Sequence, residues 1–188
     1  MDDLLDRMRS TTRARHAQLE SRLGSHERPW TREKYGRLLQ MSYAVIAPIE
    51  DLVVERLGAL VAAPPPATRA ERLRADLTEL GHAPRVRAGH RRPRVDSQAA
   101  AFGVGYVLQG SLLGGAVIAR QVRSDCAGPE IPARYLELYG PDLPKVWLRY
   151  CAALNEFGRE AAEPERQGAV VAASATFEAF GAALDSGP

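Results

Sequence analysis

Apolar residues recur at steps of three or four along most of this chain of 188 residues, which is the period of an amphipathic α-helix. No convincing segment alternates between apolar and polar positions, as a half-buried strand would. Thirteen prolines and sixteen glycines separate the periodic segments. The pattern therefore predicts an all-α protein, with residues 1–188 forming a single compact domain built as a bundle of seven or eight helices.

The ends of the predicted helices coincide with residues that cap helices or break them. Asp2 or Asp3 should start the first helix and Gly24 should end it. Pro48 should bend or split the second periodic segment. Thr68 and Glu71 form a capping-box pattern for a short helix. We expect helices over residues 2–23, 31–60 with a break at Pro48, 68–80, 97–119 with Asp96 as cap, 133–138, 145–162 and 165–184.

The apolar stripe of the first helix contains a histidine. The stripe consists of Leu5, Met8, Thr12, His16, Leu19 and Leu23, so His16 is expected to be buried. A neutral imidazole on such a face can bind iron, and one axial ligand is enough to hold a haem. Taken alone, however, a histidine among Leu and Met is more often an ordinary core residue. A di-iron site is not expected, because the histidines at 16, 26, 82 and 90 do not supply paired Glu-x-x-His sequences on facing helices.

The segment from Ser97 to Ala119 carries no charge and holds glycines at 103, 105, 110, 114 and 115. It is long enough to cross a bilayer, but 26% charged residues and the lack of a second such segment favour a soluble domain. Each glycine inside a helix costs about 1 kcal/mol relative to alanine. Close packing of a second helix against Gly110-x-x-x-Gly114 would explain this one pair of glycines. A flat ligand that approaches a bare, kinked backbone at Gly114 and Gly115 explains the cluster better.

Charge and cysteine usage add few candidate sites. Residues 84–94 hold six arginines and histidines, which we interpret as a solvated loop or, second, as a docking site for an acidic protein. A net charge of +2 without an aromatic platform does not indicate nucleic-acid binding. Cys126 and Cys151 are expected to be free thiols. The N-terminal segment MDDLLDRMRS lacks an apolar signal, so we expect a cytoplasmic protein that needs no membrane.

Four segments together resemble a known family: TTRARHAQLE, GVGYVLQGSLLGGAVIARQV, YLELYG followed by Trp147, and ASATFEAFGAAL. Their order and spacing are similar to those of bacterial haem oxygenases, the biliverdin-forming type found with bacterial phytochromes, over nearly the whole chain. The resemblance implies a helical bundle in which haem lies between a proximal helix and a kinked, glycine-rich distal helix.

The resemblance also assigns roles to individual residues. It implies that His16 is the proximal ligand of the haem iron and that Gly110, Ser111, Gly114 and Gly115 lie over the distal face. Haem is a flat apolar plate with two anionic propionates, so its site needs an apolar slot with cations at one edge. We expect Arg9, Arg13 and Arg149 to serve as these cations, and Tyr106 and Phe177 to line the slot. Where many relatives carry an aspartate, this chain has Ser111, whose hydroxyl can position water but supplies no carboxylate.

The implied function is that of a haem oxygenase, which opens haem to biliverdin with O2 and electrons and releases CO and ferrous iron. The chain has no dinucleotide-binding glycine motif, so the electrons should come from an external donor such as a ferredoxin or a reductase. A bacteriophytochrome is a candidate recipient of the biliverdin. Two alternatives stay open: a haem carrier or sensor that binds through His16 without turnover, and a non-haem enzyme similar to the thiaminase-like group, which would need a cysteine among acids.

Overall fold

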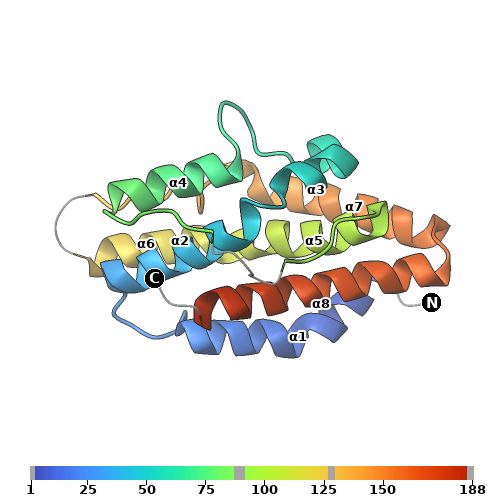
Figure 1. Ribbon diagram of the computed structural model, residues 1–188, viewed down its shortest axis with the longest axis horizontal. Coiled ribbons are helices and arrows are strands. Elements are labelled where there is room, and N and C mark those ends of the chain that lie inside the picture. Colours follow the sequence, from blue (N-terminus) through green and yellow to red (C-terminus); the bar gives the residue numbers. More distant parts are fainter. Residues whose placement is uncertain (1–2, 87–91, 127–129, 186–188) are drawn as a thin grey trace.

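The computed structural model describes residues 3–86, 92–126 and 130–185, so that residues 87–91 of the basic segment at 84–94 lie outside the described residues (Figure 1). Within this part of the chain the structure consists of helices and connecting turns and contains no strand, which confirms the predicted all-α class. The α-helices are α1 (Leu4–Leu23), α2 (Arg32–Ile46), α3 (Glu50–Leu57), α4 (Arg69–Glu79), α5 (Gln98–Gly110), α6 (Gly115–Asp125), α7 (Leu143–Glu160) and α8 (Glu163–Asp185). Short 3-10 helices occupy η1 (Gly58–Leu60), η2 (Ser111–Gly114) and η3 (Gly140–Asp142).

Most predicted helix ends are confirmed, because their caps are local. The Asp3 carboxylate accepts a hydrogen bond from the Asp6 amide at 2.9 Å, and Gly24 ends α1 in the left-handed conformation with φ 64°. Thr68 and Glu71 form both halves of a capping box on α4. The long second segment is split, as expected around Pro48, into α2 and α3.

Three local predictions are wrong. The helix expected over residues 97–119 continues through α6 and ends at Asp125. Ser97, not Asp96, caps α5: its Oγ accepts from the Ala100 amide at 3.1 Å, while Asp96 pairs with Arg94. The expected helix at 133–138 is a series of turns. The Tyr135 amide donates to the buried carboxylate of Asp76 on α4 at 3.0 Å. Within the segment the Glu137 amide donates to the Ala133 carbonyl at 2.9 Å and the Leu138 amide to the Tyr135 carbonyl at 3.2 Å, so it forms successive turns that are anchored to α4 through Asp76.

The bundle is arranged around α5. Helix α5 packs most extensively against α8, and α8 packs in turn against α1, so that α1 and α8 run side by side along one edge of the molecule (Figure 1). At the α5–α8 contact, a Cβ on Gly103 would lie 2.1 Å from the Ala169 carbonyl oxygen. Only glycine allows the two backbones to approach this closely.

One helical stretch, Gln98–Asp125, is long and apolar enough to cross a membrane by length and composition. In the molecule, 56% of its most apolar window is buried. The stretch spans α5, η2 and α6, and its first part forms the contact with α8. Its buried apolar residues therefore belong to the core of the bundle, while Leu113 and Val117 are exposed.

Candidate functional site

The predicted distal helix is kinked at the glycine cluster. Helix α5 ends at Gly110, a 3-10 turn follows over Ser111–Gly114, and α6 begins at Gly115. The Ser111 hydroxyl donates to the Leu108 carbonyl at 3.0 Å. A 3-10 turn within a helix tightens the backbone and changes the direction of the axis, so this segment can form a wall that bends around a neighbouring cleft.

The five glycines of this stretch fall into two groups. A Cβ on Gly103, Gly105 or Gly115 would lie within 3 Å of a neighbouring element: 2.1 Å from the Ala169 oxygen, 2.9 Å from the Tyr150 hydroxyl and 2.7 Å from the Leu136 oxygen. At Gly110 the nearest such neighbour is Trp147 at 3.6 Å, and at Gly114 no atom lies within 4 Å. The expectation that a ligand explains the cluster as a whole is therefore wrong for three glycines, which are required by packing.

A cleft with a volume of about 400 Å³ lies beside the kink, between α1, α5, η2, α7 and α8. It gathers seven of the residues singled out from the sequence: Arg9, Arg13, His16, Tyr106, Gly110, Ser111 and Phe177. Thr12, Val107, Leu113 and Trp147 complete its lining. These residues come from four widely separated stretches of the chain, so the fold creates a single concave site from them.

Arg149, Gly114 and Gly115 do not line this cleft. The Arg149 guanidinium donates to the Ala59 carbonyl at 3.1 Å and lies on the exposed side of α7. Gly114 is exposed and Gly115 packs beneath the backbone of Leu136.

His16 is not buried, contrary to the expectation from the apolar stripe. Its side chain is 52% exposed, and the buried residues of α1 end at Thr12. The reason is that the imidazole faces the cleft, whereas Leu19 and Leu23 further along the stripe are partly buried against the core. The imidazole meets the Phe177 ring edge to face, with centroids 5.5 Å apart and planes at 76°.

Glu20 is a further site residue that the sequence analysis missed. Its Oε2 lies 3.7 Å from Nδ1 of His16, one helical turn earlier, and 3.5 Å from Nε2 of His26. Histidines that bind metals commonly hold their second ring nitrogen against a carboxylate, which fixes the ring and raises its basicity. The signal was available, because a glutamate four residues after a histidine shares its helix face.

Cations and aromatic rings occupy different parts of the cleft. Arg9 lies on α1 two turns before His16, and Arg13 lies one turn before it. Arg9 pairs with Asp6 at 3.3 Å. Trp147 of α7, which the sequence analysis did not place in the site, packs against Tyr106 with centroids 6.0 Å apart. No carboxylate is found among the described residues that line the cleft.

A buried polar cluster supports the distal wall from behind. The Arg69 guanidinium, 1% exposed, donates to the Gln109 side chain at 3.1 Å and to the Tyr139 hydroxyl at 2.8 Å. Gln109 directly precedes Gly110, so this cluster fixes the end of α5. Burial raises the pKa of the Tyr135 phenol, while hydrogen bonding with Ser111 opposes the shift. A protonated phenol therefore lies behind the Ser111 hydroxyl.

Comparisons with known proteins agree with this arrangement. The family model described as heme oxygenase matches residues 2–186. A heme oxygenase of Xanthomonas campestris pv. campestris (strain 8004) is 33% identical over 149 residues, which cover 79% of this chain and 87% of that protein.

Two solved structures share the fold. The heme oxygenase of Leptospira interrogans has a TM-score of 0.71 at 17% identity and covers 98% of this chain and 100% of its own. The NO- and CO-bound heme oxygenase of Neisseria meningitidis has a TM-score of 0.70 at 19% identity and covers 99% of this chain and 92% of its own. Together with the match over nearly the full length, these likenesses show that the chain belongs to the heme oxygenase family.

Proposed function

We propose that this chain is a haem oxygenase that binds haem in the cleft beside His16 and opens it to biliverdin, with release of CO and ferrous iron. The observation that carries the proposal is the cleft itself, which gathers a half-exposed histidine, a kinked glycine-containing wall and two arginines in one place. These features come from different helices, and they lie together only because the bundle packs those helices around one cleft.

The lining of the cleft fits the chemistry of haem. Val107, Leu113 and Phe177 offer apolar surface to a flat macrocycle, and Trp147 and Tyr106 add an aromatic edge. We assign iron binding to His16, whose imidazole Glu20 would orient through Nδ1. Arg9 and Arg13 would meet the propionates by charge-assisted hydrogen bonds. Arg149 donates to the Ala59 carbonyl of η1 and does not line the cleft, so it is not included in this assignment.

The distal wall supplies space and hydrogen bonds. Haem, when bound, supplies the iron at which O2 is reduced and the macrocycle that is opened. Gly110 presents a backbone without side chain to the cleft, which leaves room above a flat ligand. The Ser111 hydroxyl, backed by the Tyr135 phenol, would hold a water molecule and pass protons by hydrogen bonds. The described lining offers no carboxylate for this purpose, so the proton path runs through hydroxyl groups.

The electrons would come from a separate protein, a ferredoxin or a reductase, because the chain has no dinucleotide-binding glycine motif. An acidic donor would suit the basic residues near the cleft, Arg9 and Arg13. The biliverdin would then be available to a bacteriophytochrome. Reduction of the hemin-loaded protein by purified ferredoxin, followed by transfer of biliverdin to an apo-phytochrome, tests both assignments.

A second candidate function is a haem carrier that does not turn over. It is favoured by the lack of a carboxylate in the described lining. The thiaminase-like alternative has no such support, because Cys126 and Cys151 both lie outside the cleft. Burial raises the pKa of the Cys151 thiol, and the Cys126 thiol donates to the Trp30 carbonyl at 3.5 Å.

Hemin titration followed by turnover separates these functions. We expect a saturable Soret band, which decays into biliverdin absorption when ascorbate or a reductase system is added under air. A Soret band that persists as a stable ferrous-oxy spectrum would support the carrier and refute the enzyme. If no Soret shift occurred on titration, haem binding itself would be disproved.

A further inference from the structure

The distal segment has two arms, α5 and α6, which are attached to the bundle in different ways. Helix α5 packs closely against α8 and α3, whereas among the described helices α6 packs closely only against η2, from which it continues. The buried residues of α6 are Gly115, Ala119 and Val122, which share one side of the helix. A 3-10 turn between two helices is a point at which the axis can change direction. The orientation of α6 relative to α5 therefore depends on what binds the far end of α6.

The far end of α6 is bound by the loop that follows α1, residues 24–31, which we call the strap. The Trp30 amide donates to the Asp125 carboxylate at 2.8 Å, and Nε of Arg28 donates to the same carboxylate at 2.9 Å. The indole Nε1 of Trp30 donates to the Gln121 side chain at 3.1 Å. Gln121 and Asp125 are four residues apart on α6 and share a face of the helix. Two successive turns of α6 are therefore bound to one loop.

The strap is itself fixed by its neighbours. The Trp30 side chain is 1% exposed, and Nζ of Lys34 lies 4.5 Å from the centroid of its ring. The same Nζ donates to the Glu27 carbonyl at 2.8 Å, and the Thr31 hydroxyl caps α2. Because the indole is buried, loss of the Gln121 acceptor would leave its N–H without the hydrogen bond that offsets its burial.

The strap also contacts the proximal side of the cleft. It continues directly from α1, which carries His16 and ends at Leu23. Nε2 of His26 in the strap lies 3.5 Å from Oε2 of Glu20, the carboxylate that faces Nδ1 of His16. Figure 1 shows the end of α1, the strap and α6 at the same end of the molecule. The strap therefore joins the helix of His16 to the arm that follows the kink.

We propose that Gln121 and Asp125 are positioning residues that set the width of the cleft. By binding the strap, they hold α6 at a fixed distance from the end of α1, and this limits opening of the distal segment at the kink. The consequence for haem rests on the function proposed above, because it requires haem to lie between α1 and the kink. The tether between α6 and the strap does not depend on that function.

Hydrogen exchange of the full chain without haem, followed by mass spectrometry of its peptides, tests the tether. In Gln121→Leu the buried Trp30 N–H loses its acceptor, so we expect protection of the amides of residues 115–125 to fall about tenfold. Gln121→Glu keeps an oxygen acceptor and should restore this protection to within about twofold of the wild type.

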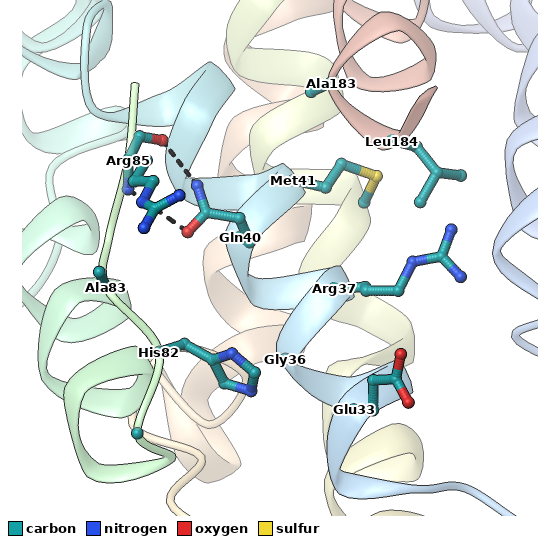
Figure 2. Close-up of a pocket in the computed structure, with 11 residues that line it drawn as sticks. Glu33, Gly36, Arg37, Gln40, Met41, His82, Ala83, Arg85, Ala183 and Leu184 are labelled. Atoms are coloured by element: carbon teal, nitrogen blue, oxygen red, sulfur yellow. Dashed lines mark hydrogen bonds between the residues drawn. The ribbon is translucent and has the colours of Figure 1, made fainter. Parts of the chain in front are cut away.

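Gln40→Leu is the matched control for the same substitution. Figure 2 shows Gln40 of α2 bonded to Arg85, so this variant also removes a bond between a helix and a loop, but outside the cleft and away from the strap. We expect protection of residues 115–125 to stay unchanged in it. Unchanged protection in Gln121→Leu, or an equal loss in Gln40→Leu, would overturn the tether, because the second result would reflect only a general loss of stability.

The rate of hemin loss tests the consequence for the cleft. Transfer of hemin from the loaded protein to excess apomyoglobin should be about tenfold faster in Gln121→Leu, because escape passes through the same opening. Gln121→Glu and Gln40→Leu should both release hemin nearly as slowly as the wild type. Hemin loss from Gln121→Leu at the wild-type rate would refute the positioning role. If the wild type gave no Soret band with hemin, the proposed function and this role in haem binding would both be refuted, while hydrogen exchange would still decide the tether.

Discussion

Replacement of Gly103 by alanine should destabilise the protein, although alanine is the better helix former. The new Cβ would lie 2.1 Å from the Ala169 carbonyl oxygen, 2.9 Å from the Ala172 Cβ and 2.9 Å from the Ala173 amide. A relaxed contact between carbon and a carbonyl oxygen is about 3.3 Å or longer. Because the oxygen belongs to the backbone of α8, it cannot rotate away, so α5 and α8 must separate by about 1 Å.

The magnitude follows from two opposing terms. Overpacking of a well-packed interface typically costs up to about 3 kcal/mol, and alanine regains about 1 kcal/mol of helix propensity. The net loss of about 2 kcal/mol should lower Tm by roughly 4–8 °C in a domain of this size. Gly114→Ala is the matched control: no atom lies within 4 Å of its added Cβ and the backbone is helical at φ −82°, so stability should stay equal or rise.

Thermal and urea unfolding of the hemin-free protein, followed by circular dichroism, measures both variants. The reasoning predicts opposite signs for two substitutions that are chemically identical and that lie eleven residues apart in one glycine-rich stretch. If Gly103→Ala were as stable as the wild type, the close approach of α5 and α8 would not exist in solution.

Three further predictions concern the cleft and the pH dependence of folding. His16→Ala should reduce ring opening to less than roughly a tenth of the wild-type rate, with partial rescue by added imidazole, and unchanged spectra would remove His16 as the ligand. Glu20→Gln should weaken hemin binding by about tenfold in a Soret titration, because the carboxylate beside Nδ1 of His16 is lost; unaltered affinity would show that Glu20 does not orient the imidazole. The hydrogen bond from Arg28 holds the pKa of Asp125 below its usual value. The stability that this interaction contributes is therefore present above the pKa of Asp125 in the unfolded chain, and it is lost as the pH falls through the pKa of Asp125 in the folded protein. Tm measured from pH 6 to pH 2 should therefore fall less steeply in Asp125→Asn than in the wild type, and parallel curves would contradict the assignment.

Local signals in the sequence predicted the helices well, because caps act within a few residues. Asp3, Gly24 and Thr68 end or begin helices through hydrogen bonds to their own neighbours. The segment at 133–138 was not predictable in this way, since the carboxylate that binds its backbone comes from Asp76, 59 residues away from Tyr135. Ser97 and Asp96 are equally good caps by type, so the residue type alone gave no reason to prefer Ser97 over the predicted Asp96.

Some residues of the candidate site could be placed from the sequence, and others could not. The spacing on α1 places Arg9, Arg13 and His16 near one another, and the structure puts all three in the cleft. Periodicity shows that a helix face is apolar, but not whether that face meets another helix or a cleft, and this is why His16 was expected to be buried. The position of Arg149 depends on the rotation of α7 about its axis, which no local pattern fixes.

The glycine-rich stretch links the packing of the bundle to the shape of the cleft. Its first part, at Gly103, sets the distance between α5 and α8, and α8 carries Phe177, which contacts the imidazole of His16. Its later part, at Gly110, forms the opposite wall. Because α1 packs on α8, a wider spacing at Gly103 would also move His16 away from the kink. Gly103, which does not touch the cleft, therefore helps to set its width, and Gly103→Ala should weaken hemin binding as well as folding.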